Sequence, residues 1–232
     1  MSRRLLLGSI GAAVVLAGVL AAVLTLGSGG SKHPAASELT GVTMVQNLLA
    51  GVPQHGQALG SPTAPVTVVE FADPQCPYCA EWARNGLPGI VATYVRTGKV
   101  RIVFNGMDFV GADSETALRT ALAAGRQNRF WNVLELLYEN QGTENTGWVN
   151  DSFLRSVGEA VPGLDVQKML DARTSKPVEQ ALAQAAALAN EAGVNSTPTF
   201  AVGRTGGSLQ LVQVTSLTAA GLAPSIDAAL AS

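Results

Sequence analysis

Pro65-Val-Thr-Val-Val-Glu-Phe-Ala72 is a nearly continuous apolar run, and three residues separate it from Cys76-Pro-Tyr-Cys79. A short apolar run of this kind predicts a β-strand buried on both faces of a sheet. Residues Ala80 to Val95 predict a helix, which its two glycines and one proline should kink or interrupt. This order places the first thiol at a helix N-terminus, where unpaired N–H groups and the helix dipole favour an anion such as a thiolate.

The two thiols are the only cysteines in the chain, so no second pair is left to brace the fold. We interpret Cys76 as a nucleophile of lowered pKa and Cys79, one helical turn on, as the resolving thiol. Half a zinc site and a stabilising disulfide are the alternatives. A zinc site normally needs four ligands, and the chain adds only His33 and His55, both near linkers. We therefore predict redox chemistry, and we expect neither a metal nor a cofactor.

A long uncharged segment lies near the N-terminus. Leu5 to Leu26 has 22 residues without a charge, and as a helix it would measure about 33 Å, which matches the hydrocarbon core of a bilayer. Arg3 and Arg4 precede it, so the positive-inside rule places residues 1–4 in the cytoplasm and the rest of the chain outside. We predict a single-pass cell-membrane anchor at residues 5–26. A cleaved secretory signal is the alternative, and either one places the thiols in an oxidising compartment.

The remaining pattern predicts an α/β domain with an inserted helical block. Residues 27–51 are predicted to be a Gly/Ser-rich linker and a short helix capped by Ser37, and residues 52–232 the domain. A second strand at Val100–Phe104 gives a right-handed parallel crossover. The insertion covers about residues 113–192, which is too long for a simple connection. Its helices are predicted at 114–124 with Asp113 as the cap, 128–139, 151–159, 165–172 and 177–192; a hairpin at 199–202 and 209–212 and a helix at about 217–230 follow.

Two further positions carry alternatives that the pattern leaves open. Glu70, six residues before Cys76, is either a buried carboxylate that moves the proton of Cys79 or a solvated residue on a partly exposed strand face. Pro198 is either an ordinary trans proline at a strand start or a cis proline. A cis bond could bring the backbone of Thr197 alongside Cys76 and offer an edge to an extended peptide.

Three stretches together resemble the DsbA-like, thioredoxin-fold oxidoreductases of bacterial envelopes. They are Leu59-Gly-Ser-Pro-Thr-Ala-Pro-Val-Thr67, Val69-Glu-Phe-Ala-Asp-Pro-Gln-Cys-Pro-Tyr-Cys79 and Val194-Asn-Ser-Thr-Pro-Thr-Phe200. The resemblance covers about Val52 to the C-terminus and implies a thioredoxin-like fold with the helical insertion. It also implies a set of roles: Cys76 attacks, Cys79 resolves, Glu70 is the buried acid, Thr197-Pro198 is the cis-proline loop, and Thr197, Pro77 and Tyr78 contact the substrate.

The expected function is a monomeric dithiol oxidase that forms disulfides in exported proteins with cysteines. Family members of this kind are commonly kept oxidised by a quinone-linked membrane partner of the DsbB or vitamin-K-epoxide-reductase type. The formal net charge is only −2 and no basic cluster is present, which argues against nucleic acid. Pro-Tyr between the cysteines also resembles glutaredoxins and some isomerases. A membrane-anchored reductase or isomerase, and a non-catalytic peptide-binding module, are therefore the alternatives.

Overall fold

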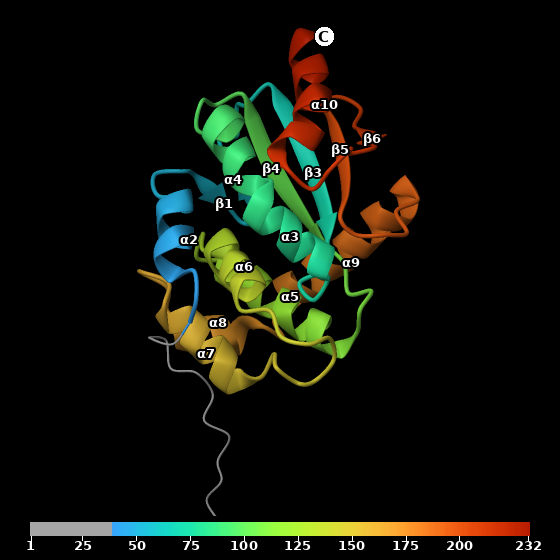
Figure 1. The fold of residues 1–232 in the computed structure, drawn as a ribbon. Coiled ribbons are helices and arrows are strands. Elements are labelled where there is room, and N and C mark those ends of the chain that lie inside the picture. The colour runs from blue at the N-terminus through green and yellow to red at the C-terminus, as the bar shows by residue number, and fades with distance from the viewer. Residues whose placement is uncertain (1–38) are drawn as a thin grey trace, which may run out of the picture. The chain divides into compact units, whose positions relative to one another are not determined.

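The structure is a computed structural model, and it describes residues 39–232 (Figure 1). The predicted anchor at residues 5–26, the Gly/Ser-rich linker at 27–34 and the Ser37 cap lie outside the described residues. Within residues 39–232, no helix combines the length and the apolar character needed to cross a bilayer.

A six-stranded sheet with the order β1-β2-β4-β3-β5-β6 forms the centre of the described part. Its middle strand β3 (Val66–Ala72) pairs in parallel with β4 (Val100–Gly106) and antiparallel with β5 (Thr199–Arg204). Every residue of β3 is buried, so the predicted strand is confirmed, and β4 runs two residues beyond its predicted end. The predicted hairpin is also present. The edge strands are short: β1 (Gln54–His55), β2 (Ala58–Leu59) and β6 (Gln210–Val212).

Helices cover both faces of this sheet (Figure 1). Since side chains alternate along a strand, β3 sends two sets of residues to opposite faces. Val68 and Ala72 join the core beneath α3 (Pro77–Asn85), α4 (Leu87–Ile90) and α10 (Ala219–Ala231). Val69 and Phe71 pack on the other face with Ala189 of α9 (Lys176–Ala192). Glu70 lies between Val69 and Phe71 in the sequence and shares a strand face with Val68 and Ala72, so it points to the α3 face.

The helix after the cysteines is broken where its sequence predicted. It begins at Pro77, ends at Asn85, resumes as the short α4 and closes with a π-helical turn, η2 (Val91–Val95). Gly86 stands at the break, and a Cβ atom there would overlap the indole ring of Trp82. The glycine therefore lets Trp82 lie against its own helix end while its ring faces the core.

Five helices make up the predicted insertion between β4 and β5. They are α5 (Ala112–Gly125), α6 (Phe130–Glu139), α7 (Asp151–Glu159), α8 (Val166–Ala172) and α9; α2 (Val42–Leu49) packs against α6 from outside the insertion.

Two helix starts in the insertion differ from the prediction. Asp113 does not cap α5, because the helix begins at Ala112 and its N-cap is Gly111, with a φ of 147° that favours glycine. The Asp113 carboxylate instead accepts the backbone N–H of Gly147 at 2.9 Å. The helix predicted from residue 128 begins at Phe130, since Asn128 adopts the left-handed region with a φ of 55°.

Candidate active site

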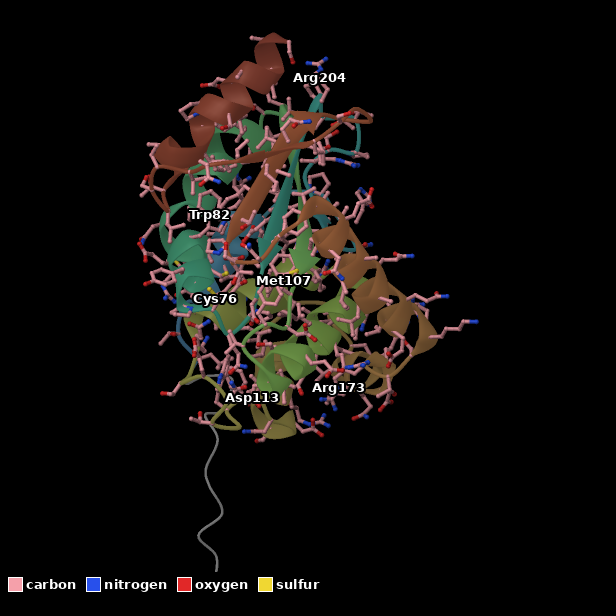
Figure 2. The ribbon with its side chains drawn as sticks, turned by 90° about the vertical axis from the view of Figure 1, so that its right-hand side faces the viewer. Cys76, Trp82, Met107, Asp113, Arg173 and Arg204 are labelled. Atoms are coloured by element: carbon pink, nitrogen blue, oxygen red, sulfur yellow. The ribbon has the colours of Figure 1, made fainter. Side chains whose placement is uncertain are left out.

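Cys76 lies at the carboxyl end of β3, where α3 begins. It is the N-cap residue of that helix with an extended backbone (φ −67°, ψ 121°), and Pro77 follows at a helical position that needs no N–H partner. Cys76 is 6% exposed, Cys79 is fully buried, and Tyr78 between them is 62% exposed. Figure 2 shows Cys76 at one end of α3 and Trp82 farther along the same helix. Of the two thiols, therefore, only Cys76 can meet a partner from outside.

The two thiols have pKa shifts in opposite directions. The pKa of Cys76 is lowered from 9.0 to about 6, first by a hydrogen bond with the Cys79 thiol and then, against the effect of burial, by the Thr197 side chain and the N–H groups of Cys79 and Tyr78. Burial raises the pKa of Cys79, and the neighbouring Cys76 raises it further. At neutral pH the site therefore holds a thiolate at Cys76 and a thiol at Cys79.

The Thr197-Pro198 loop lies against the nucleophile although 121 residues separate it from Cys76. The peptide bond between these two residues is cis, as the resemblance implied. The Cys76 thiol donates to the Thr197 carbonyl oxygen at 3.5 Å. Thr199 begins β5, which pairs with β3, so the sheet brings the loop and the thiol together. Pro77 and Tyr78, which follow Cys76 at the start of α3, are exposed, and contact of these residues with substrate stays a prediction.

A buried polar network that sequence reasoning missed holds the turn between β3 and Cys76. The Asp73 carboxylate accepts the Ser114 hydroxyl at 2.6 Å and the backbone N–H groups of Gln75 and Val110 at 2.7 and 2.9 Å. The Gln141 side chain donates to the carbonyl oxygens of Pro74 and Cys76. A signal for the first part was present, because Asp73 and Gln75 are polar residues within the apolar strand–helix junction. Nothing in the sequence pointed to Gln141.

Glu70 is buried beneath α3, with 2% of its surface exposed. Its solvated alternative is wrong, because helices cover both faces of the central strand. Burial raises its pKa from 4.5 to about 8. The indole N–H of Trp82 acts in the opposite direction, although the geometry falls short of a full hydrogen bond and this N–H has no other acceptor among the described residues. Glu70 is thus mostly protonated at neutral pH, with a donor at hand for its ionised form.

A second buried carboxyl, Glu135 of α6, escaped the sequence prediction. It is 3% exposed, and burial raises its pKa well above the ordinary value, with a further contribution from the charge of Glu70. The available signal was its place on the helix, since Glu135 follows Trp131 by four residues and precedes Tyr138 by three. Residues at these spacings share one face.

The arrangement is suited to thiol–disulfide exchange. A stabilised thiolate lies just beneath the surface with 6% of the residue exposed, a fully buried thiol follows one helical turn on, and a buried acid lies below the helix that carries both. Both cysteines are free thiols in this structure, which therefore represents the reduced state. Within residues 39–232, no group of three or more His, Cys, Asp or Glu residues is placed to hold a metal ion.

Comparison with known proteins identifies relatives of this chain. A family model described as thioredoxin matches residues 54–208. The chain is 32% identical over 149 residues to a probable disulfide bond formation protein D of Bacillus cereus. The aligned residues make up 63% of this chain and 69% of that protein. It is 25% identical over 146 residues to the disulfide bond formation protein D of Bacillus subtilis, across 62% of this chain and 66% of the relative.

Solved structures show the same fold. Oxidised BdbD of Bacillus subtilis superposes with a TM-score of 0.67 at 22% identity, over 79% of this chain and 98% of that one. DsbA of Chlamydia trachomatis superposes with a TM-score of 0.62 at 18% identity, over 75% and 89% of the two chains. A thioredoxin-like oxidoreductase of Silicibacter pomeroyi gives 0.58 at 27% identity, over 81% and 98%.

Proposed function

This chain belongs to the thioredoxin family as a DsbA-like thiol-disulfide oxidoreductase, and we propose that it is a dithiol oxidase for exported proteins. The observation that favours oxidation of the substrate, rather than its reduction, is the lowered pKa of Cys76, about 6, beside the raised pKa of Cys79. A stabilised thiolate favours the reduced form of the pair, so its disulfide is a stronger oxidant. The same stability makes Cys76 a good leaving group when a substrate disulfide is completed.

The proposed reaction is two successive displacements at sulfur. A substrate thiolate attacks Cys76, the Cys76–Cys79 bond breaks, and Cys79 leaves and takes up a proton. A second substrate thiolate then attacks the substrate sulfur of the mixed disulfide, and Cys76 leaves as the thiolate. The substrate is oxidised from two thiols to one disulfide, and the enzyme is reduced from a disulfide to a dithiol. Glu70 is the proposed proton donor to Cys79, because it is a carboxyl buried beneath α3.

The Thr197-Pro198 loop and the exposed Tyr78 are the proposed substrate contacts. They flank Cys76, and the first offers backbone groups to an extended peptide. Two supports favour work outside the cytoplasm: the relatives named as disulfide formation proteins and the apolar segment at residues 5–26. The enzyme, acting as a monomer, would be returned to its disulfide form by a membrane partner that passes electrons to quinone.

The redox state of Cys76 and Cys79 in cells tests the direction. Cells that express the full chain are quenched in acid, and free thiols are labelled with an alkylating agent that changes the mobility of the protein. An oxidase is expected to be mainly in the disulfide form. A mainly reduced pair would contradict the proposal and favour a reductase or isomerase. Cys76→Ser is the control, and an undiminished cellular function of this variant would favour a non-catalytic peptide-binding module.

A further inference from the structure

Two carboxyls from different parts of the fold are buried near enough to each other that the charge of Glu70 raises the pKa of Glu135. Glu70 comes from the central strand and Glu135 from the inserted helical block, and both are almost fully buried. Exchange at Cys79 requires one acid, and the chemistry described so far assigns no role to the second. A role for that second acid rests on the proposed thiol–disulfide exchange.

The aromatic packing locates both carboxyls. On the sheet, Glu70 stands between Phe104 and Phe200, its partners on the neighbouring strands. Phe200 contacts Trp82 of α3 with ring centroids 4.7 Å apart, and Phe104 contacts Trp131 of α6 at 6.1 Å. The carboxyl of Glu70 therefore lies below both helices, between the two indole rings.

Glu135 faces the same space from α6. It lies one turn after Trp131 and one turn before Tyr138, on the helix face that both aromatic rings turn towards the sheet. The Tyr138 hydroxyl donates to the carbonyl oxygen of Asp73 at 3.3 Å, at the end of β3. Burial raises the pKa of this hydroxyl well above its ordinary value, and the charges of Cys79, Glu70, Glu135 and Asp73 raise it further.

The surroundings of the two carboxyls are unequal. Glu70 has the otherwise unpaired indole N–H of Trp82 nearby, and this donor favours its ionised form. Within residues 39–232 no hydrogen bond reaches the Glu135 carboxyl, and the cation that lowers its pKa is Arg84, whose guanidinium donates to the Tyr138 carbonyl oxygen at 2.7 Å. When one carboxyl of a close buried pair ionises, the like charge makes the second hold its proton more tightly. Glu70 is thus the member that ionises first, and Glu135 is the member that keeps a proton.

We propose that Glu135 stores the proton that reaches Cys79, and that it delivers this proton through Glu70. When Cys79 leaves as a thiolate, the proton of Glu70 moves to the sulfur and leaves a carboxylate. The proton of Glu135 then moves to Glu70, and Glu135 regains a proton from solvent at the α6 end that carries the half-buried Glu139. Glu135 touches no reacting sulfur, so it is a positioning and supply residue rather than a catalytic one.

Other ionisable groups around α6 are accounted for. The turn after β3 adds Asp73, and α3 adds Arg84 and the two cysteines, while α2 carries no ionisable residue. On α5, the Asp113 carboxylate accepts a backbone N–H, and Glu115 forms an ion pair with Arg119. On α7, Asp151 forms an ion pair with Arg173, Arg155 donates a hydrogen bond to Gln167, and Glu159 is exposed to solvent. α6 itself adds Tyr138 and Glu139, and the charge of Glu139 also raises the pKa of Glu135. The pH dependence of the cluster therefore depends on Glu70 and Glu135, with Glu139 as a third carboxyl.

The test compares rates on either side of the Glu70 pKa, which is about 8. The oxidised full chain is reduced by a peptide with two cysteines, and the rate of Glu135→Gln is divided by that of the wild type at each pH. At about pH 6 Glu70 is itself protonated, so the ratio is expected to be near one. At about pH 9, one unit above this pKa, about a tenth of Glu70 keeps its proton, and in the wild type Glu135 supplies the remainder. There the variant should be up to about tenfold slower, which lies below the roughly 10²- to 10⁴-fold that a positioned acid contributes.

A ratio that is the same at both pH values would overturn the proposal, because a merely structural defect does not follow the ionisation of Glu70. Glu135→Asp should recover part of the rate at high pH. Glu191→Gln, on the exposed end of α9, is the matched control and should leave the ratio at one throughout. The peptide reaction measures exchange whichever direction operates in cells, so failure of the oxidase proposal would leave this comparison intact.

An infrared spectrum provides a readout that needs no turnover. At neutral pH the wild type is expected to show the absorption of two protonated carboxyls, Glu70 and Glu135, and Glu135→Gln should remove the part that belongs to Glu135. An unchanged carboxyl band would mean that Glu135 is ionised, and the proposal would be wrong.

Discussion

Replacement of Glu70 by glutamine should stabilise the protein at neutral pH, although it removes a proposed proton donor. Burial raises the pKa of this carboxyl from 4.5 to about 8. Below about pH 4 the folded and unfolded states both hold the proton, so the variant and the wild type should be equally stable. As the pH rises, the unfolded carboxyl ionises while the folded one keeps its proton. The wild type therefore loses stability relative to the variant until the pH passes about 8.

The magnitude follows from the pKa shift. Stability falls by about 1.36 kcal/mol for each pH unit between the two pKa values. Neutral pH lies about 2.5 units above the unfolded pKa, so Glu70→Gln should gain roughly 3 kcal/mol there. For a chain of this size that corresponds to a Tm increase of about 6–12 °C. The ionisation of Cys76 and Glu135 is common to both proteins and largely cancels in the difference.

Chemical denaturation of the full chain at about pH 4 and about pH 7 measures this gain. Glu191→Gln is the control, since its carboxyl is exposed and should give no difference at either pH. A Glu70→Gln variant that is equally stable at both pH values, or less stable at neutral pH, would refute the account of Glu70 as a buried neutral acid.

Three further predictions test the site and its support. Cys79→Ala should trap mixed disulfides between Cys76 and substrates, which non-reducing gels would show as adducts; a lack of adducts would argue against Cys76 as the attacking thiol. The same variant should raise the Cys76 pKa, measured by thiolate absorbance, because the Cys79 hydrogen bond is the largest cause of the lowering. Thr197→Val should raise the Cys76 pKa by a smaller amount, since it removes one contributing hydrogen bond, and an unchanged titration would contradict that contribution. Gly86→Ala should lower the free energy of unfolding by about 1–3 kcal/mol, the usual cost of overpacking, because its Cβ would overlap the Trp82 ring; unchanged stability in denaturation would count against this close packing.

The sequence predicted the elements whose signals are local. The strand Val66–Ala72 is apolar except at Thr67 and Glu70 because both of its faces are covered, and such a run is visible without tertiary information. The cysteine spacing and Pro77 placed the thiols at a helix start in the same way. The cis bond before Pro198 came from the resemblance alone, since the pattern also allowed a trans bond.

The parts that escaped prediction depend on contacts between distant segments. Glu70 could not be assigned as buried from its strand alone, because burial depends on α3 and α6, which later residues form. Glu135 resembled a solvent-facing acid between two leucines until its helix face met the sheet. Asp113 was a reasonable cap by residue type, but the conformation of Gly111 begins the helix earlier. For the two buried acids the deciding interaction spans tens of residues, whereas the start of α5 is decided locally by the conformation of Gly111.

The reduction potential of the Cys76–Cys79 pair against glutathione tests the central claim most directly. The lowered Cys76 pKa predicts a potential well above that of thioredoxin, towards the roughly −120 mV of the strongly oxidising DsbA type. A value near about −270 mV, typical of thioredoxin, would contradict the account and indicate a reductase.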